Sequence, residues 1–246
     1  MLEQIRAELA PTGVLRAAIN LSNFLLVTGR SSNGDPEGIS PDMAIALAQK
    51  LDLPVKFVPF DTPGQVADAA LEDIWDIANI GAEPERSKTI SFTDAYVEIS
   101  ATYLLPETSK IKTIQEVDRE GVRIAVYGRA AYGLWLSENI RHATLLKADS
   151  HAQAFEWFVS DKLDVLAGLA PGLVKDLDRL PGSRLVDGQF SAVQQAIGTK
   201  PERALSIAFL REFVAQSKAS GFVADLIDKH GVKGSLNVAP GTPSSS

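Results

Sequence analysis

The stretch DIANIGAEPERSKTISFTDAY, residues 76–96, carries the most information about the fold. Its first part predicts a short buried strand, and Gly81 leaves backbone N–H groups uncovered where that strand ends. The segment from Glu83 to Arg86 then predicts a turn or short helix. An arginine just past the carboxyl end of a strand can point into a binding cleft, where its planar guanidinium matches a carboxylate with two parallel hydrogen bonds. Spacing alone slightly favours the plainer alternative, a solvated Arg86 paired with Glu83 or Glu85.

Outward from this stretch, helices and strands alternate along the chain. The predicted strands are 14–20, 55–60, 76–81, 101–105, 122–126, 144–147 and 163–166, and the main predicted helices are 41–51, 65–72, 130–139, 151–159, 203–220 and 222–230. Residues 24–41 predict a loop, and residues 163–173 predict a buried strand followed by a turn. This alternation is typical of parallel sheets with helices on their faces.

Two similar βαβ modules, near residues 14–81 and 122–166, predict two lobes. In open α/β sheets ligands bind at the carboxyl ends of the strands, and in a two-lobed protein the cleft between the lobes is the expected site. The last residues, PGTPSSS, predict a disordered tail.

Composition excludes several classes of protein. The chain has 246 residues, of which 45% are hydrophobic and 22% charged, as in a packed globular protein. Its net charge of −7 argues against nucleic acid and anionic membrane surfaces as partners. The absence of cysteine removes disulfides, thiolate metal sites and cysteine nucleophiles, and leaves the redox compartment open. No stretch reaches the ~20 apolar residues of a membrane-spanning helix.

The usual enzymatic signatures are missing. The three histidines, His142, His151 and His230, are not spaced as a helical zinc site, and each is predicted to be a surface residue. There is no G-x-S-x-G elbow, no phosphate-binding G-x-x-x-x-G-K-[ST] loop and no G-x-G-x-x-G after a strand. We therefore expect no cofactor and no metal, and the sequence weakly favours binding over catalysis.

The first residues predict no signal peptide, because Glu3, Arg6 and Glu8 interrupt the apolar core that a signal needs. Two interpretations follow. The native protein stays in the cytoplasm, or a signal was removed and the protein is periplasmic.

Three stretches resemble the ABC-importer extracellular solute-binding proteins of family 3, the amino-acid-type periplasmic binding proteins. They are GISPDMAIALAQKLDLPVKF (38–57), the stretch 76–96 with its Glu85-Arg86, Phe92 and Tyr96, and GVRIAVYG (121–128). The resemblance covers most of the chain. It implies an α/β fold of type II with two lobes, 1–104 plus 192–246 and 105–191, each a mostly parallel sheet flanked by helices and joined by two hinge strands.

The resemblance also implies site residues and partners. Arg86 would grip a ligand carboxylate, assisted by N–H groups of Gly81 and Ala82. In the second lobe the turn Gly128-Arg129-Ala130 would offer N–H groups at a helix start, with Arg129 as a second cation. The expected protein is a monomer that closes around a small molecule and delivers it to an ABC-transporter permease.

Departures from the family pattern narrow the ligand. Amino-acid binders of the family usually hold the ligand ammonium with acidic residues at positions that align here with Asn20 and Leu169, and neither is charged. Asn23 and Phe24 stand where an aromatic wall is usual. Because a buried ammonium needs a carboxylate, we expect a small mono- or dicarboxylate. Glu83 could serve a cationic group, which leaves a modified amino acid open. The plainer alternatives are loop capping by the two asparagines and a core position for Leu169.

Two other functions stay open. Relatives of the family act as dehydratases of cyclohexadienyl acids, and Glu83 is the best-placed acid for that chemistry, although an ion pair of Glu83 with Arg86 is the plainer interpretation. Other relatives are ligand-sensing domains of receptors. Tyr96, Tyr127 and Tyr132 are candidate aromatic residues of the cleft, with core packing as the alternative.

Overall fold

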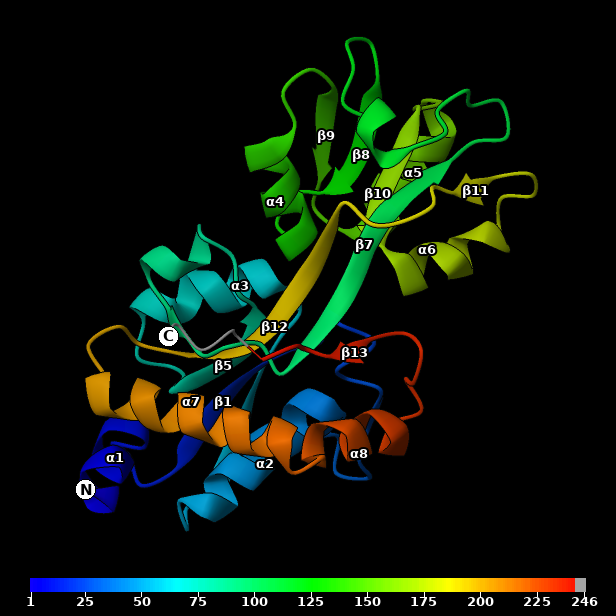
Figure 1. Cartoon of the computed structure of the whole chain (residues 1–246). Helices are drawn as coiled ribbons and strands as arrows, with labels where there is room; N and C mark the ends of the chain where they lie inside the picture. Colours follow the sequence, from blue (N-terminus) through cyan, green and yellow to red (C-terminus); the bar gives the residue numbers. More distant parts are fainter. Residues whose placement is uncertain (242–246) are drawn as a thin grey trace. The chain divides into compact units, whose positions relative to one another are not determined.

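The computed structural model describes residues 1–241 and divides the chain into two compact units (Figure 1). Unit 1 comprises Met1–Glu98 and the chain from Gln194 onward, and unit 2 comprises Ile99–Val193. Strands β7 (Val97–Leu105) and β12 (Ser191–Thr199) carry the chain from one unit to the other. The predicted lobe boundaries, at residues 104 and 191, fall within the same two strands. Of the predicted disordered tail, residues 242–246 lie outside the described residues.

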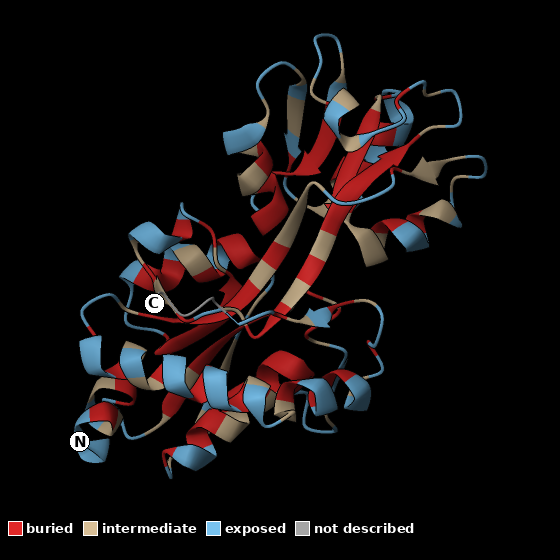
Figure 2. Ribbon diagram, in the orientation of Figure 1, coloured by how far each residue is buried: buried red, intermediate tan, exposed pale blue. Residues whose placement is uncertain are grey.

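Unit 1 is built on a sheet whose first strands are parallel. Strand β1 pairs in parallel with β4 on one side and β5 on the other, and β12 runs antiparallel to β5. Because both faces of such a sheet are covered, β1 and β5 are buried almost throughout (Figure 2). The strands of this unit are β1 Leu15–Asn20, β2 Gly29–Arg30, β3 Pro36–Glu37, β4 Val55–Phe60, β5 Ile77–Gly81, β6 Ser91–Phe92 and β13 Asn237–Val238.

Helices cover both faces of this sheet. Figure 1 shows α3 on one side of β1 and β5, and α1, α2, α7 and α8 on the other. Helix α3 starts with a complete capping box between Thr62 and Gln65, and Pro63 fits the first turn. Its apolar residues pack with Trp75 and Ile80 into a buried cluster. The helices are α1 Leu2–Leu9, α2 Ile39–Lys50, α3 Pro63–Asp68 (followed by the 3-10 turn Ala69–Leu71), α7 Ala204–Ala219 and α8 Phe222–Lys229.

A buried carboxylate anchors the beginning of β5. Asp76 is fully buried, and its Oδ2 accepts hydrogen bonds from the backbone N and the Nε of Arg16, each at 2.9 Å. Its Oδ1 accepts from Nη2 of Arg16 at 2.8 Å and from both terminal nitrogens of Arg203 at 3.2 Å. Hydrogen bonds to Asp76 hold the pKa of the Arg16 guanidinium above its usual range. This network ties β1, β5 and the start of α7 together.

The middle of β5 carries a polar side chain in an apolar setting. Asn79 is buried opposite Ile19 of β1 and Ile197 of β12. Within residues 1–241, neither atom of its side-chain amide has a hydrogen-bond partner.

Unit 2 repeats the same construction with fewer strands. Strand β10 lies between β8, which is parallel to it, and β7, which is antiparallel, and β9 continues the sheet beyond β8. Helix α5, capped by Ser150, packs Phe155 and Phe158 into the core of the unit. The elements are β8 Arg123–Tyr127, α4 Ala131–Asn139, β9 Thr144–Ala148, α5 His151–Ser160, β10 Val165–Leu169, α6 Ala170–Leu177 and β11 Arg184–Leu185, with a 3-10 turn at Ile114–Glu116.

The predicted α/β class is confirmed: β4, β1 and β5 pair in parallel in unit 1, and β10, β8 and β9 pair in parallel in unit 2, within one mixed sheet. Two local predictions are wrong. The predicted turn after Leu169 is helix α6, because Pro171 and Gly172 lie in its first turn, where a proline costs no helical hydrogen bond. The predicted loop 24–41 contains the β2–β3 hairpin and the first residues of α2. Among residues 1–241, no helix combines the length and apolarity needed to cross a bilayer.

Candidate functional site

Arg86 lies at the carboxyl end of β5. It is only 4% exposed, and its Nη1 donates a 2.7 Å hydrogen bond to the carbonyl oxygen of Gly81, the last residue of the strand. Arg86 begins the 3-10 turn Arg86–Lys88, and its carbonyl oxygen accepts hydrogen bonds from the backbone N–H groups of Thr89 at 3.1 Å and Ile90 at 3.0 Å, just after the turn. Arg86 is therefore not solvated, and Glu85 forms an ion pair with Lys88, while the pairing of Arg86 with Glu83 stays a prediction. A buried guanidinium is thus fixed at the edge where α/β sheets bind ligands.

Two neighbours of Arg86 complete this corner of unit 1. Glu83 is 7% exposed, and its carbonyl accepts hydrogen bonds from the backbone N–H and hydroxyl of Ser87. The backbone N–H of Ala82 donates to the carbonyl of Gln194 in β12 at 2.8 Å. This pairing removes Ala82 from the backbone donors expected for a ligand.

The residues after β1 form the neighbouring loop on the same edge. The Oδ1 of Asn20 accepts from the backbone N–H and hydroxyl of Ser22, and the Oδ1 of Asn23 accepts from the N–H of Leu25. Both asparagines are buried and brace the loop, as the plainer interpretation expects, while Phe24 is half-buried. The parallel pairing of β1 and β5 brings this loop and Arg86 to one edge of the sheet.

In unit 2, the turn after β8 is held tightly. The N–H of Gly128 donates to the carbonyl of Ala148, and the N–H of Ala130 donates to that of Tyr127. Two of the predicted anion donors are therefore already paired, and Arg129 is exposed. Helix α4 follows without a side-chain cap at Ala130. Gly133 lets α4 approach this turn, because a Cβ there would lie 2.1 Å from the Tyr127 carbonyl oxygen.

The carboxyl edge of unit 2 also holds a pair that the sequence did not reveal. Nε2 of His151 lies 2.7 Å from Oδ2 of Asp176 on α6. Leu169, the expected site position, is half-buried at the end of β10. Because 25 residues separate the pair in sequence, no local spacing signals it. His151 was predicted only as a surface residue.

The candidate aromatic residues are buried. Tyr96 is completely buried with its hydroxyl 3.1 Å from that of Ser40, and burial raises the pKa of the phenol. Burial likewise raises the pKa of Tyr132, with smaller contributions from Tyr127 and Asp176. Both are core residues that stay neutral at physiological pH.

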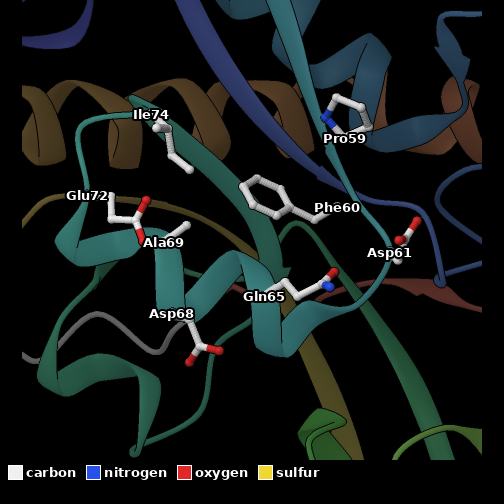
Figure 3. Close-up of a pocket in the computed structure, with 8 residues that line it drawn as sticks. All are labelled: Pro59, Phe60, Asp61, Gln65, Asp68, Ala69, Glu72 and Ile74. Carbon is white, nitrogen blue, oxygen red and sulfur yellow. The ribbon is translucent and has the colours of Figure 1, made fainter.

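A cavity of about 410 Å³ lies elsewhere in unit 1, beside edge strand β4 and helix α3 (Figure 3). The ring of Phe60 points into it, and Pro59 and Ile74 lie on either side. It contains none of the predicted ligand residues, although three acidic side chains rim it: Asp61, Asp68 and Glu72. Over residues 1–241, no group of three or more histidine or acidic side chains is arranged to hold a metal ion.

Solved structures share this fold. An arginine-binding protein variant, ArgBP from T. maritima, superposes with a TM-score of 0.72 at 20% identity, over 94% of this chain and 100% of the other. A lysine-complexed putative ABC-transporter binding component from Wolinella succinogenes gives 0.73 at 17% identity, over 91% and 97%. The ancestral amino acid-binding protein AncCDT-1, described as a precursor of cyclohexadienyl dehydratase, gives 0.71 at 23%, over 93% and 98%. These likenesses confirm the predicted fold, that of type II periplasmic binding proteins.

Two curated relatives are more similar in sequence. The chain is 27% identical over 159 residues to a cyclohexadienyl dehydratase of Pseudomonas aeruginosa, covering 63% of this chain and 59% of the relative. It is also 27% identical over 143 residues to the ABC transporter glutamine-binding protein GlnH of Bacillus subtilis, covering 55% and 50%. The matches thus span half to three fifths of these relatives.

A family model gives the broadest match. The model described as bacterial extracellular solute-binding proteins, family 3, matches residues 25–233, which cover all of unit 2, most of unit 1 and every predicted site residue except Asn20, Asn23 and Phe24. The chain therefore belongs to the bacterial extracellular solute-binding proteins of family 3.

Proposed function

We propose that the chain captures a small carboxylate-bearing metabolite for an ABC importer and that Arg86 holds the carboxylate. The observation that carries this proposal is the burial of the Arg86 guanidinium at the carboxyl end of β5, with Nη1 fixed on the Gly81 carbonyl. A guanidinium positioned in this way needs little reorganisation to donate two parallel bonds to an acid. The low exposure strengthens that contact, because water competes weakly.

The neighbouring residues favour an acid without an ordinary α-ammonium group. Asn20 and Leu169 stand where family members commonly carry acidic residues, and Asn20 uses its Oδ1 to brace the loop. Glu83 is the buried acid nearest in sequence to Arg86, so a modified amino acid is the other ligand class that fits. A second cation, Arg129, lies on the turn that begins α4 in unit 2 and suits a dicarboxylate.

Family membership supports the remaining parts of the proposal. The two units would close around the ligand by bending at β7 and β12, the strands that connect them. The loaded protein would then dock as a monomer on an ABC-transporter permease. A receptor of this kind works outside the inner membrane, and the genomic sequence upstream of Met1 tests for a signal that directs it there.

A thermal-shift screen tests the proposal directly. Succinate, glutarate, glutamate, glutamine, arginine and lysine would be added one at a time. A compound present at about 100 Kd stabilises the protein by about 2.7 kcal/mol, which is readily seen as a higher melting temperature. We expect an acid to give the largest shift and Arg86→Ala to abolish it. A shift that only arginine or lysine produces, or no shift with any acid, would overturn the proposal.

Dehydratase activity is a second candidate, favoured by the 27% identity to a cyclohexadienyl dehydratase. In this interpretation Glu83, which is 7% exposed, protonates a ring hydroxyl that leaves as water, while the ring carboxylate leaves as CO2 and its bonding electrons complete the aromatic ring. Incubation with prephenate or arogenate, followed by absorbance of an aromatic product, tests it. Product formed by the wild type and lost in Glu83→Gln would support this activity, and no product with either substrate excludes both as substrates.

A further inference from the structure

We propose that His151, oriented by Asp176, is a specificity-determining residue that donates a hydrogen bond from Nδ1 to an acidic group of a ligand at the carboxyl edge of unit 2. The inference rests on the proposed function, because it assumes that an acid is bound. It extends that function by assigning a proton-linked contact to unit 2.

The position of His151 suits this role. It is the first residue of α5 and follows β9, so it lies at the carboxyl edge of the parallel strands of unit 2. Its Cε1 is next to β10, since a Cβ built on Gly168 would lie 3.1 Å from it. Glycine at 168 therefore makes room for the imidazole beside Leu169, the predicted ligand position.

The partners of the ring determine which nitrogen can meet a ligand. Nε2 is engaged with Oδ2 of Asp176 at 2.7 Å, and the other oxygen of that carboxylate lies 3.7 Å from Nη1 of Arg179. The Asp176 side chain is 9% exposed, whereas that of His151 is 34% exposed. Because the buried carboxylate accepts the Nε2 proton, Nδ1 is the nitrogen left for a ligand, and it makes no hydrogen bond within residues 1–241.

The chemistry of the pair gives the contact its preference. A neutral ring with its proton on Nε2 offers only an acceptor at Nδ1, whereas a protonated ring offers a donor. A ligand carboxylate needs the donor, so binding of an acid is coupled to proton uptake. The Asp176 carboxylate offsets the charge of a protonated ring, while Arg179, 3.7 Å from the same carboxylate, acts in the opposite direction.

Other charged or titratable groups lie on the elements around the ring. Arg179, two residues past the end of α6, stacks its guanidinium 3.8 Å over the ring of Phe155. From α4, Tyr132 stays neutral because burial raises the pKa of its phenol. Tyr127 is the last residue of β8. Asp149 precedes α5, and its backbone N–H donates a hydrogen bond to the side-chain oxygen of Gln153.

Calorimetric titration with succinate and with glutarate tests the proposal. Each acid is titrated at pH 6 and pH 8, in two buffers of different ionisation enthalpy that report proton uptake. For the wild type we expect affinity for the tighter acid to fall roughly tenfold from pH 6 to pH 8, as an imidazole loses its proton. Proton uptake should be measurable at pH 8.

The variants separate a ligand contact from a structural role. His151→Gln retains an amide donor toward Asp176 but cannot be protonated, so it should bind about tenfold more weakly at pH 6 and lose the pH dependence. Asp176→Asn should weaken the dependence, and Gly168→Ala should reduce affinity by displacing the ring. The matched control is His142→Gln, which changes an exposed histidine of the same unit and should behave as the wild type.

A measurement on the wild type covers the case in which a variant fails to fold. The chain has three histidines, so ¹⁵N-detected imidazole spectra can be assigned with few variants. Addition of the acid should convert Nδ1 of His151 from acceptor to N–H while His142 stays unchanged. An unchanged His151 spectrum in the bound state overturns the inference.

The outcomes distinguish this inference from the proposed function. In one outcome the acid binds the wild type, Arg86→Ala abolishes binding, and His151→Gln keeps both the affinity and the pH dependence of the wild type. The inference then fails and the proposed function stands. If neither succinate nor glutarate binds the wild type, the inference fails, and the wider ligand screen decides the proposed function separately.

Discussion

The two ends of strand β5 both hold buried arginines, and the partners of these arginines differ. At the amino end, Asp76 is fully buried and bonded by Arg16 and Arg203, so the protein supplies the cations and the anion together. At the carboxyl end, Arg86 donates to the neutral carbonyl of Gly81. The first cluster joins β1, β5 and the start of α7 and so stabilises the fold, whereas the second lies at the edge where we propose that a ligand acid binds.

The largest expected effect comes from breaking the cluster at the amino end of β5, which consists of Asp76, Arg16 and Arg203. Asp76→Asn removes the fully buried carboxylate that Arg16 and Arg203 share, and breaking a buried ion pair in this way typically costs about 3–5 kcal/mol of the free energy of unfolding. Urea denaturation measures this loss. Asp73→Asn is the matched control, because Asp73 also contacts Arg16 but its side chain is 71% exposed, and we expect a much smaller effect. Similar losses in the two variants would contradict a structural role specific to Asp76.

In the middle of β5, between the two ends, a substitution is expected to stabilise the protein rather than destabilise it. Asn79 is a buried amide without a hydrogen-bond partner in residues 1–241, and such a group costs about 1–3 kcal/mol. Valine fits a strand between apolar neighbours, so Asn79→Val should raise the free energy of unfolding by about 1 kcal/mol in urea denaturation. A clear loss of stability would show that the amide has a partner, such as an ordered water.

The smallest expected effect concerns a carboxylate of unit 2, that of Asp118, which accepts hydrogen bonds from backbone N–H groups rather than from arginines. Although desolvation acts in the opposite direction, N–H groups of Ala143, His142 and Arg141 hold the pKa of Asp118 below its usual range. A lowered folded-state pKa adds stability that is present above the unfolded pKa and is lost as pH falls through the folded value.

Asp118→Asn should therefore destabilise the protein by about 1 kcal/mol at pH 7, a figure discounted for the exposure of the carboxylate. The difference from the wild type should shrink as the pH is lowered through about 3.9 and below. Urea denaturation at pH 7 and thermal melts down to pH 3 measure it. The neighbouring exposed Glu120→Gln is the control, and a pH-independent difference for Asp118→Asn would refute this account.

The sequence predicts much of this arrangement because the signals are local. Alternating strands and helices give the α/β class, and the spacing from Gly81 to Arg86 places the arginine just past a strand. The burial of Arg86 is not local information, since it depends on how the turn folds back on the carbonyl of Gly81. The pairing of the Ala82 N–H with the carbonyl of Gln194 has no local signal either, because the two residues are 112 positions apart in the sequence.

The missed features have similar physical causes. Helix α6 was missed because proline and glycine usually signal turns, yet Pro171 is compatible with a first helical turn. The pair of His151 and Asp176 forms only when α5 and α6 pack on β10, so neither residue carries a sequence signal of its own. The sequence therefore points to Arg86 in unit 1 and gives no signal for the pair of His151 and Asp176 in unit 2.

The most direct test of the central claim is calorimetric titration of the strongest acid from the screen into wild type, Arg86→Lys and Arg86→Ala, with urea unfolding of the same samples. The account predicts that Arg86→Ala weakens binding at least tenfold, in line with a loss of about 2–5 kcal/mol for a desolvated charge pair. Lysine, which keeps the charge without the planar fork, should be intermediate. All three proteins should remain folded. An Arg86→Ala variant that is folded and binds the acid as tightly as the wild type would contradict the account.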